Sequence, residues 1–71
     1  MHIGQLIKQE LEVQGRTVVW FARNMSYSRT NIYKIFERSS IDTDVLLRVS
    51  MVLEVDFFKL YSEYLKVKKK S

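Results

Sequence analysis

The sequence predicts an all-α fold, a compact five-helix domain, from three observations. Apolar residues recur at intervals of three and four along most of the chain, which is the spacing that places them on one side of a helix. The 71 residues include no proline and only two glycines, and 46% are hydrophobic, a composition typical of helical domains and not of disordered chains. Short links between the periodic stretches favour a helical bundle.

The first two helices are expected over residues 3–14 and 18–25. Gly15 should end the first, because glycine readily takes the left-handed conformation that follows a helix. Thr17 offers a hydroxyl to the free amides of the second. Trp20 falls beside the apolar stripe of that helix, so packing on a neighbour or partial exposure is expected, with a contact from its indole N–H to a phosphate as the alternative. The apolar faces are Ile3, Leu6, Ile7 and Leu11 in the first helix, and Val18, Phe21, Ala22 and Met25 in the second.

Three further helices are expected over residues 29–37, 43–53 and 57–66, with Ser28, Asp42 and Asp56 as their capping residues. The fourth is the most apolar, which predicts a central position for it. Residues 1–66 then form the domain, and residues 67–71 are expected to fray as a basic tail. The apolar residues are Tyr27, Ile32 and Ile35 around the third helix, Leu46, Leu47, Val49, Val52 and Leu53 in the fourth, and Phe57, Leu60, Tyr61, Tyr64 and Leu65 in the fifth.

The placement of the charges says more than the formal net charge of +4. Residues 17–41 carry four basic side chains against Glu37 alone, whereas residues 42–65 carry five acidic side chains against two basic ones. A positive excess on one part of a small domain is typical of nucleic-acid contact. Residues 66–71 add four lysines, for which a solubilising role is favoured over phosphate binding. These lysines are Lys66, Lys68, Lys69 and Lys70.

The chain lacks the residues that several classes of function require. The chain has no cysteine, and His2 is its only histidine, so neither a disulfide framework nor a thiolate or histidine metal site is expected. It also lacks a glycine-rich phosphate loop and a paired nucleophile and base, so no enzyme and no cofactor are expected. The longest apolar run, residues 18–22, is far too short to span a membrane, and residues 1–10 do not resemble a signal peptide. A cytoplasmic protein with no membrane partner is therefore expected.

Residues 17–37 carry two short helical patterns on either side of a polar turn, which predicts a helix-turn-helix formed by the second and third helices. Their apolar residues share one side. The remaining side chains offer positive charge and hydrogen-bond donors and include no carboxylate until Glu37, which suits nucleic acid. These side chains are Arg23, Ser28, Arg29, Thr30, Asn31, Tyr33 and Lys34.

Over residues 3–65 the chain resembles the lambda-repressor-like domains of the Xre/Cro type. The matching positions, in register, are Thr17, Phe21, Ala22, Met25, Ser26, Tyr27, Ser28, Arg29, Ile32, Ile35, Leu46, Leu47 and Leu53. Two positions differ, because Ser26 and Glu54 stand where the family has glycine. Both positions often require a positive φ, which costs other residues about 1 kcal/mol. Phe36 replaces a common glutamate and predicts an added core contact.

The resemblance implies roles for three sets of residues. The recognition helix, Arg29 to Glu37, would enter the major groove of double-stranded DNA. A fifth helix with more apolar residues than a small domain can cover would supply a two-fold dimer contact. The base-reading residues would be Arg29, Thr30 and Tyr33; the phosphate contacts Thr17, Ser28, Asn31, Lys34, Arg38 and Ser40; and the dimer contacts Phe58, Tyr61, Tyr64 and Leu65.

Two functions follow as hypotheses. The first is a sequence-specific transcriptional regulator of bacterial or phage origin, a homodimeric repressor associated with the nucleoid. The alternative is a protein-interaction module of the same fold, or an antitoxin, which binds a protein partner through the fourth and fifth helices. Taken singly, the polar residues of the third helix would be no more than a solvated surface. The register of the apolar positions beneath them favours the first hypothesis.

Overall fold

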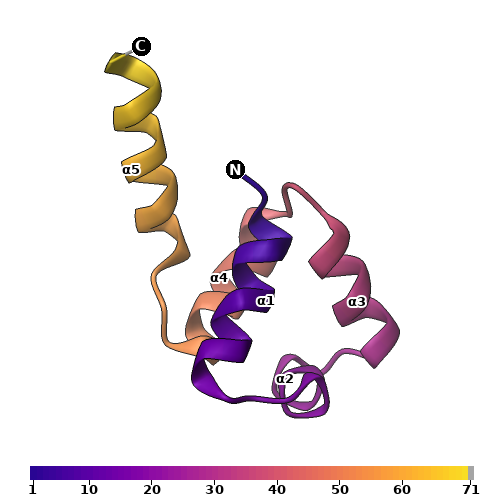
Figure 1. Cartoon of the computed structure of the whole chain (residues 1–71). Coiled ribbons are helices and arrows are strands. Elements are labelled where there is room, and N and C mark those ends of the chain that lie inside the picture. Colours follow the sequence, from indigo (N-terminus) through magenta and orange to yellow (C-terminus); the bar gives the residue numbers. More distant parts are fainter. Residues whose placement is uncertain (71) are drawn as a thin grey trace.

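The computed structural model describes residues 1–70 of the chain. These residues form five α-helices joined by short links, and they include no strand (Figure 1). The all-α prediction is therefore confirmed, and α1 to α4 begin and end at the expected residues. The helices are α1 (Ile3–Gln14), α2 (Val18–Met25), α3 (Arg29–Glu37), α4 (Thr43–Leu53) and α5 (Phe57–Lys70).

Local capping explains why the helices begin where they do. In each expected cap a side-chain oxygen accepts a hydrogen bond from a backbone N–H in the first turn, which stabilises a helix by about 1 kcal/mol. His2 caps α1 in the same way through Nδ1, which accepts from the Gln5 N–H at 3.1 Å. The four expected caps are Thr17 to the Trp20 N–H at 3.0 Å, Ser28 to Asn31 at 3.2 Å, Asp42 to Asp44 at 2.7 Å and Asp56 to Lys59 at 3.1 Å.

Left-handed residues end three of the helices. Gly15 has a φ of 68° after α1, as expected. Ser26 and Glu54 have φ values of 58° and 55° after α2 and α4, so these positions adopt a positive φ without glycine. Each costs the fold about 1 kcal/mol relative to glycine. The left-handed conformation lets the next backbone N–H donate a hydrogen bond to a carbonyl in the last turn of the helix: the Tyr27 N–H donates to the Ala22 carbonyl at 2.9 Å.

Helices α1 to α4 enclose one hydrophobic core. α1 packs on α3 and α4, and α2 packs on the same two helices, so no single helix lies at the centre. The expectation of a central α4 is wrong, because one side of this helix faces solvent. Two of its apolar residues lie on that side: Leu47 is 50% exposed, and Met51 is also exposed. The buried core is Ile3, Ile7, Leu11, Phe21, Ala22, Met25, Ile32, Ile35, Phe36, Leu46, Val49, Leu53 and Phe57.

α5 leaves this core as an arm. Phe57, 1% exposed, anchors its first turn, and Leu60 and Tyr61 pack at the edge of the core, but the helix then extends away from α1 and α4 (Figure 1). The molecule is consequently 40 Å long and about 20 Å wide. α5 continues to Lys70, so its expected end near residue 66 is wrong; the expected fraying of the tail stays a prediction, and Ser71 lies outside the described residues. Lysines are good helix formers, and the helix dipole favours them at a C-terminal end.

The first turn of α1 lies directly on the last turn of α3. The Ile3 N–H donates to the Ser39 carbonyl at 3.0 Å, and the Gly4 N–H donates to the Arg38 carbonyl at 2.9 Å. A Cβ atom on Gly4 would overlap the carbonyl oxygens at the end of α3. Gly4 is therefore a close-approach position that sets how α3 is held, a role that the sequence analysis did not assign to it.

Candidate nucleic-acid interface

The candidate site is the outer face of α3. This helix buries only Ile32, Ile35 and Phe36, so its remaining side chains face away from the core. The three predicted base-reading residues, Arg29, Thr30 and Tyr33, are all exposed, Tyr33 by 54%. The fold thus gathers them on one open surface, within two turns of the N-terminal end of α3.

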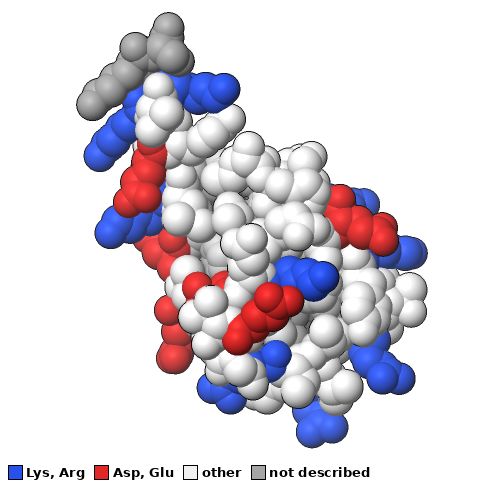
Figure 2. All heavy atoms as spheres, in the orientation of Figure 1, with Lys and Arg blue, Asp and Glu red and all other residues white. Residues whose placement is uncertain are grey.

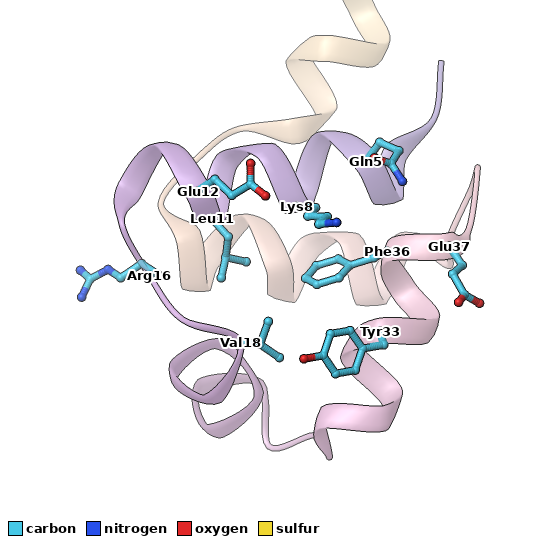
Figure 3. Close-up of a pocket in the computed structure, with 9 residues that line it drawn as sticks. All are labelled: Gln5, Lys8, Leu11, Glu12, Arg16, Val18, Tyr33, Phe36 and Glu37. Carbon is cyan, nitrogen blue, oxygen red and sulfur yellow. The ribbon is translucent and has the colours of Figure 1, made fainter.

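Two shallow grooves flank α3. The first holds about 270 Å³ between α1, the start of α2 and α3, with the apolar side chains of Leu11, Val18 and Phe36 among its walls (Figure 3). The second holds about 390 Å³ between α3 and the start of α4. Residues of α3 line both grooves, so the helix forms a ridge between them. The second groove contains Tyr27, Asn31, Lys34, Ile35, Arg38, Ile41, Asp42 and Val45.

Tyr33 is held in place at the edge of the first groove. Its ring meets the Phe36 ring edge-to-face, with centroids 6.1 Å apart and planes at 77°. This geometry is a favourable one for aromatic pairs. In Figure 3 the Tyr33 hydroxyl points across the groove toward Val18. Tyr33 would therefore contact a ligand from the side of α3 that borders the first groove, and not from the part of the helix surface that lies farthest from the core.

The predicted phosphate contacts fall into three places. Thr17 and Ser28 begin α2 and α3, where free amides and the helix dipole favour an anion. Each hydroxyl oxygen accepts a capping bond and keeps its own proton for a further acceptor. Asn31, Lys34 and Arg38 line the second groove together. Ser40 is separate, since it lines a hollow at the base of α5 with Phe58 and Tyr61.

Two basic residues that the sequence analysis did not select also border this face. Lys8 and Arg16 line the first groove, although they are far from α3 in the sequence. The Arg16 guanidinium lies 4.3 Å from the centroid of the Trp20 ring, a cation–π contact that restrains it. The position of Arg16 directly before the cap of α2 was the available signal. Glu12 and Glu37 line the same groove, so its lining holds as many acidic as basic side chains.

The charges are unevenly distributed over the molecule. On the face in Figure 2, most charged side chains at the lower right, over α2 and α3, are basic, and several acidic ones lie on the left near the base of α5; further acidic groups lie at the centre and at the right, beside α3. The tip of α5 is basic again. Long-range attraction would therefore draw a polyanion to the side of the domain that presents α3.

Arg48 fixes the turn that connects α2 to α3. From α4 its Nη2 donates to the Met25 carbonyl at 2.6 Å, and its guanidinium lies 5.6 Å from the centroid of the Tyr27 ring. The bond satisfies one of the free carbonyls at the end of α2, where the helix dipole favours a cation. A basic residue outside the α2–α3 segment thus holds the angle between the two helices.

Replacement of Arg48 by methionine is expected to lower the free energy of unfolding by about 1 to 3 kcal/mol, because the partly buried Met25 carbonyl loses a charged donor. Urea denaturation followed by circular dichroism measures the change. Arg23, an exposed arginine of α2, provides the matched control: Arg23→Met should alter stability by less than about 0.5 kcal/mol. Equal effects of the two substitutions would contradict the role given to Arg48.

Comparison of the chain with protein-family models, curated proteins and solved structures finds no match. Within residues 1–70, no group of three or more histidine, cysteine, aspartate or glutamate side chains is arranged to hold a metal ion. None of the helices described has both the length and the apolar character required to cross a membrane.

Proposed function

We propose that the chain is a sequence-specific DNA-binding regulator that presents α3 to the major groove, in the manner of the Xre/Cro-type domains that its sequence resembles. One observation carries the proposal: α3 is an exposed polar ridge between two grooves, and each groove carries basic side chains. The major groove is about 12 Å wide, admits one helix and is bordered by two phosphate backbones. A ridge with basic side chains in the groove on each side is complementary to that shape.

The proposal gives the exposed residues different roles. Arg29 can donate two hydrogen bonds to a guanine, Thr30 can touch a thymine methyl group, and Tyr33 can reach a base edge beside the groove. Contacts to phosphates place the protein on DNA without reading sequence. The phosphate contacts would be Lys8, Arg16 and Thr17 on one side, and Ser28, Asn31, Lys34 and Arg38 on the other.

The regulator would bind as a homodimer and act as a repressor. Two copies would place their α3 helices in successive major grooves, with half-sites about 34 to 36 Å apart. A dimer bound across a promoter would block RNA polymerase.

The exposed apolar residues of α4 and α5 favour a second candidate function, a protein-interaction module or antitoxin. Leu47, Met51 and Leu65 are large side chains that a single copy leaves in water. The two functions differ in their response to salt. DNA binding weakens with salt at a log–log slope of about −0.9 for each phosphate contacted, whereas an apolar protein contact is far less sensitive.

The two α3 substitutions Arg29→Ala and Lys34→Ala should weaken DNA binding in different ways. Sites selected from a random DNA pool by the wild-type protein supply the probe. Arg29→Ala should cost about 1 to 3 kcal/mol on the selected site and relax the preference at one base pair. Lys34→Ala should weaken selected and random DNA alike and reduce the salt slope by about 1. Fluorescence anisotropy at several salt concentrations measures both.

Either of two results would count against DNA binding: a selection that enriches no sequence, or affinities that neither substitution changes. Loss of a protein partner through changes in α5, with α3 variants fully active, would favour the interaction module.

A further inference from the structure

The first groove beside α3 is an apolar hollow with charged side chains at its mouth. Its inner walls are formed by Leu11, Val18, Tyr33 and Phe36, which come from three helices and point toward one another (Figure 3). The space between them is about 270 Å³. Pockets that hold drug-sized ligands measure about 300 to 1,000 Å³ and combine apolar walls with a few polar groups. The first groove has that character on a smaller scale, so it suits a molecule below drug size.

The charged groups around the first groove are balanced in sign. In Figure 3 Arg16 and Glu37 point away from the hollow at its two ends, whereas Lys8 and Glu12 project from α1 between those ends. Lys8 and Glu12 are four residues apart on α1, and neither forms an ion pair with another described residue. The mouth of the groove therefore offers a cation and an anion about 6 Å apart along the helix axis.

A zwitterion with an apolar side chain is complementary to this arrangement. An α-amino acid carries its carboxylate, its ammonium group and its side chain on the same carbon atom. When the carboxylate meets Lys8 and the ammonium group meets Glu12, the side chain is directed into the hollow. A ligand with a single charge would pair with one of these two groups and be repelled by the other. An aromatic side chain can also add to the edge-to-face contact that Tyr33 and Phe36 already make.

We propose that the first groove binds an α-amino acid with an apolar side chain. Lys8 binds its carboxylate and Glu12 binds its ammonium group, and the apolar walls enclose its side chain. Both ion pairs lie in contact with solvent, where such a pair contributes about 0.2- to fivefold less than a buried one would suggest only in the sense that each changes affinity by about two- to fivefold. The site should therefore be weak, with a dissociation constant of about 0.1 to 1 mM.

The bound amino acid engages two residues that the proposed function assigns to DNA. Its carboxylate neutralises Lys8, a proposed phosphate contact, and its side chain lies against the ring of Tyr33, a proposed base contact. Ligand and DNA therefore compete, and a saturating ligand should weaken DNA binding at least about fivefold. By linkage, DNA weakens ligand binding by the same factor. This regulatory step rests on the function proposed above, whereas the amino-acid site itself does not.

An NMR titration of the full chain without DNA tests the site. L-phenylalanine is added to isotope-labelled protein, and the backbone amide shifts report both the affinity and the location of binding. Saturable shifts should be centred on residues 5–18 and 33–37, which include the lining of the groove, and not on residues 57–70 of α5. Phenylpropionate lacks the ammonium group and phenylethylamine lacks the carboxylate. Each should bind about two- to fivefold more weakly than L-phenylalanine.

Two substitutions separate the roles of the charged groups. Lys8→Met should weaken binding of L-phenylalanine about two- to fivefold but should not weaken binding of phenylethylamine, which has no carboxylate. Glu12→Gln should weaken L-phenylalanine by a similar factor but not phenylpropionate, which has no ammonium group. Lys59→Met and Glu63→Gln are the matched controls, because these exposed residues of α5 do not line the groove, and neither should change any of the affinities. Circular dichroism melts confirm that every variant is folded.

Fluorescence anisotropy with the selected DNA site tests the competition. L-phenylalanine at a saturating concentration should raise the dissociation constant for DNA at least about fivefold. L-serine at the same concentration is the control, because it is a zwitterion without an apolar side chain, and it should have no effect.

Three results of the NMR titration would overturn the site. They are no saturable shift below about 10 mM L-phenylalanine, shifts centred outside the groove, and equal affinity for the amino acid and its two singly charged analogues. Saturable binding that leaves the affinity for DNA unchanged would overturn the competition. Because the titration contains no DNA, the amino-acid site and the proposed DNA binding can fail independently of each other.

Discussion

Replacing Gly4 by alanine is expected to destabilise the domain by at least about 2 kcal/mol. The added Cβ would overlap the carbonyl oxygens of Ile35, Phe36 and Arg38. These are backbone atoms, so they cannot move aside as the end of a flexible side chain could. To relieve the overlap, α1 must separate from α3, which breaks the bond of 2.9 Å from the Gly4 N–H to the Arg38 carbonyl.

The expected loss of stability in Gly4→Ala is the difference between the cost of steric overlap and the gain in helix propensity. Alanine favours a helix by about 1 kcal/mol relative to glycine, and that gain offsets only part of the cost of overlap. Domains of this size have a total stability of about 0.05 to 0.15 kcal/mol per residue, or roughly 4 to 11 kcal/mol for 71 residues. The loss is therefore a large share of the total, and a fraction of the Gly4→Ala protein should be unfolded even at moderate temperature.

Gly15 supplies a matched control for Gly4. It has a positive φ, but a Cβ there would meet no atom within 4 Å. Gly15→Ala should therefore cost only about 1 kcal/mol, from backbone strain alone. Urea denaturation of both variants gives the comparison. A Gly4→Ala protein as stable as Gly15→Ala would show that α1 does not approach α3 as closely as described.

The helix boundaries could be predicted from the sequence because capping is local. Thr17, Ser28 and Asp42 each bond to an amide two or three residues ahead, so the residues that decide where a helix starts are adjacent in the chain. The left-handed positions at Ser26 and Glu54 are local in the same sense. Buried residues at helical spacing, such as Ile32 and Ile35, could be recognised for a similar reason.

Other features depend on contacts between distant segments, which periodicity does not reveal. Gly4 matters because of the end of α3, and Arg48 because of the carbonyl of Met25. The apolar pattern of α5 is as regular as that of α1, yet most of α5 leaves the core. Regular spacing shows that a helix has an apolar side, but not which molecule covers it.

In the candidate site, too, local features could be predicted from the sequence, whereas those that depend on contacts between distant segments could not. The exposure of Arg29, Thr30 and Tyr33 follows from the register of α3 and could be predicted. The contribution of Lys8 could not, since it depends on the packing of α1 beside α3. The resemblance implies a phosphate contact at Ser40, but the turn after α3 carries this residue to the base of α5.

Truncation of Ile32 to alanine should have the other largest effect, a loss of about 2 to 5 kcal/mol in the free energy of unfolding. Ile32 is fully buried in the middle of α3, where it packs into the shared core of α1 to α4. Removing its outer carbons leaves a cavity that surrounding helices can fill only in part. Because α3 also presents the exposed polar ridge, its loosening should abolish DNA binding together with stability.

Ile32→Val separates packing from surface chemistry at the same position. It removes one methylene, should cost only about 0.5 to 1.5 kcal/mol, and should leave the affinity for the selected DNA site unchanged. Arg29→Ala should behave in the opposite way, with DNA binding weakened and stability within about 0.5 kcal/mol of the wild-type value. Measuring stability and DNA affinity for all three variants distinguishes a residue that supports α3 from one that reads DNA. If Ile32→Ala kept its stability, or if Arg29→Ala unfolded the domain, the division of α3 into a buried and a binding side would be wrong.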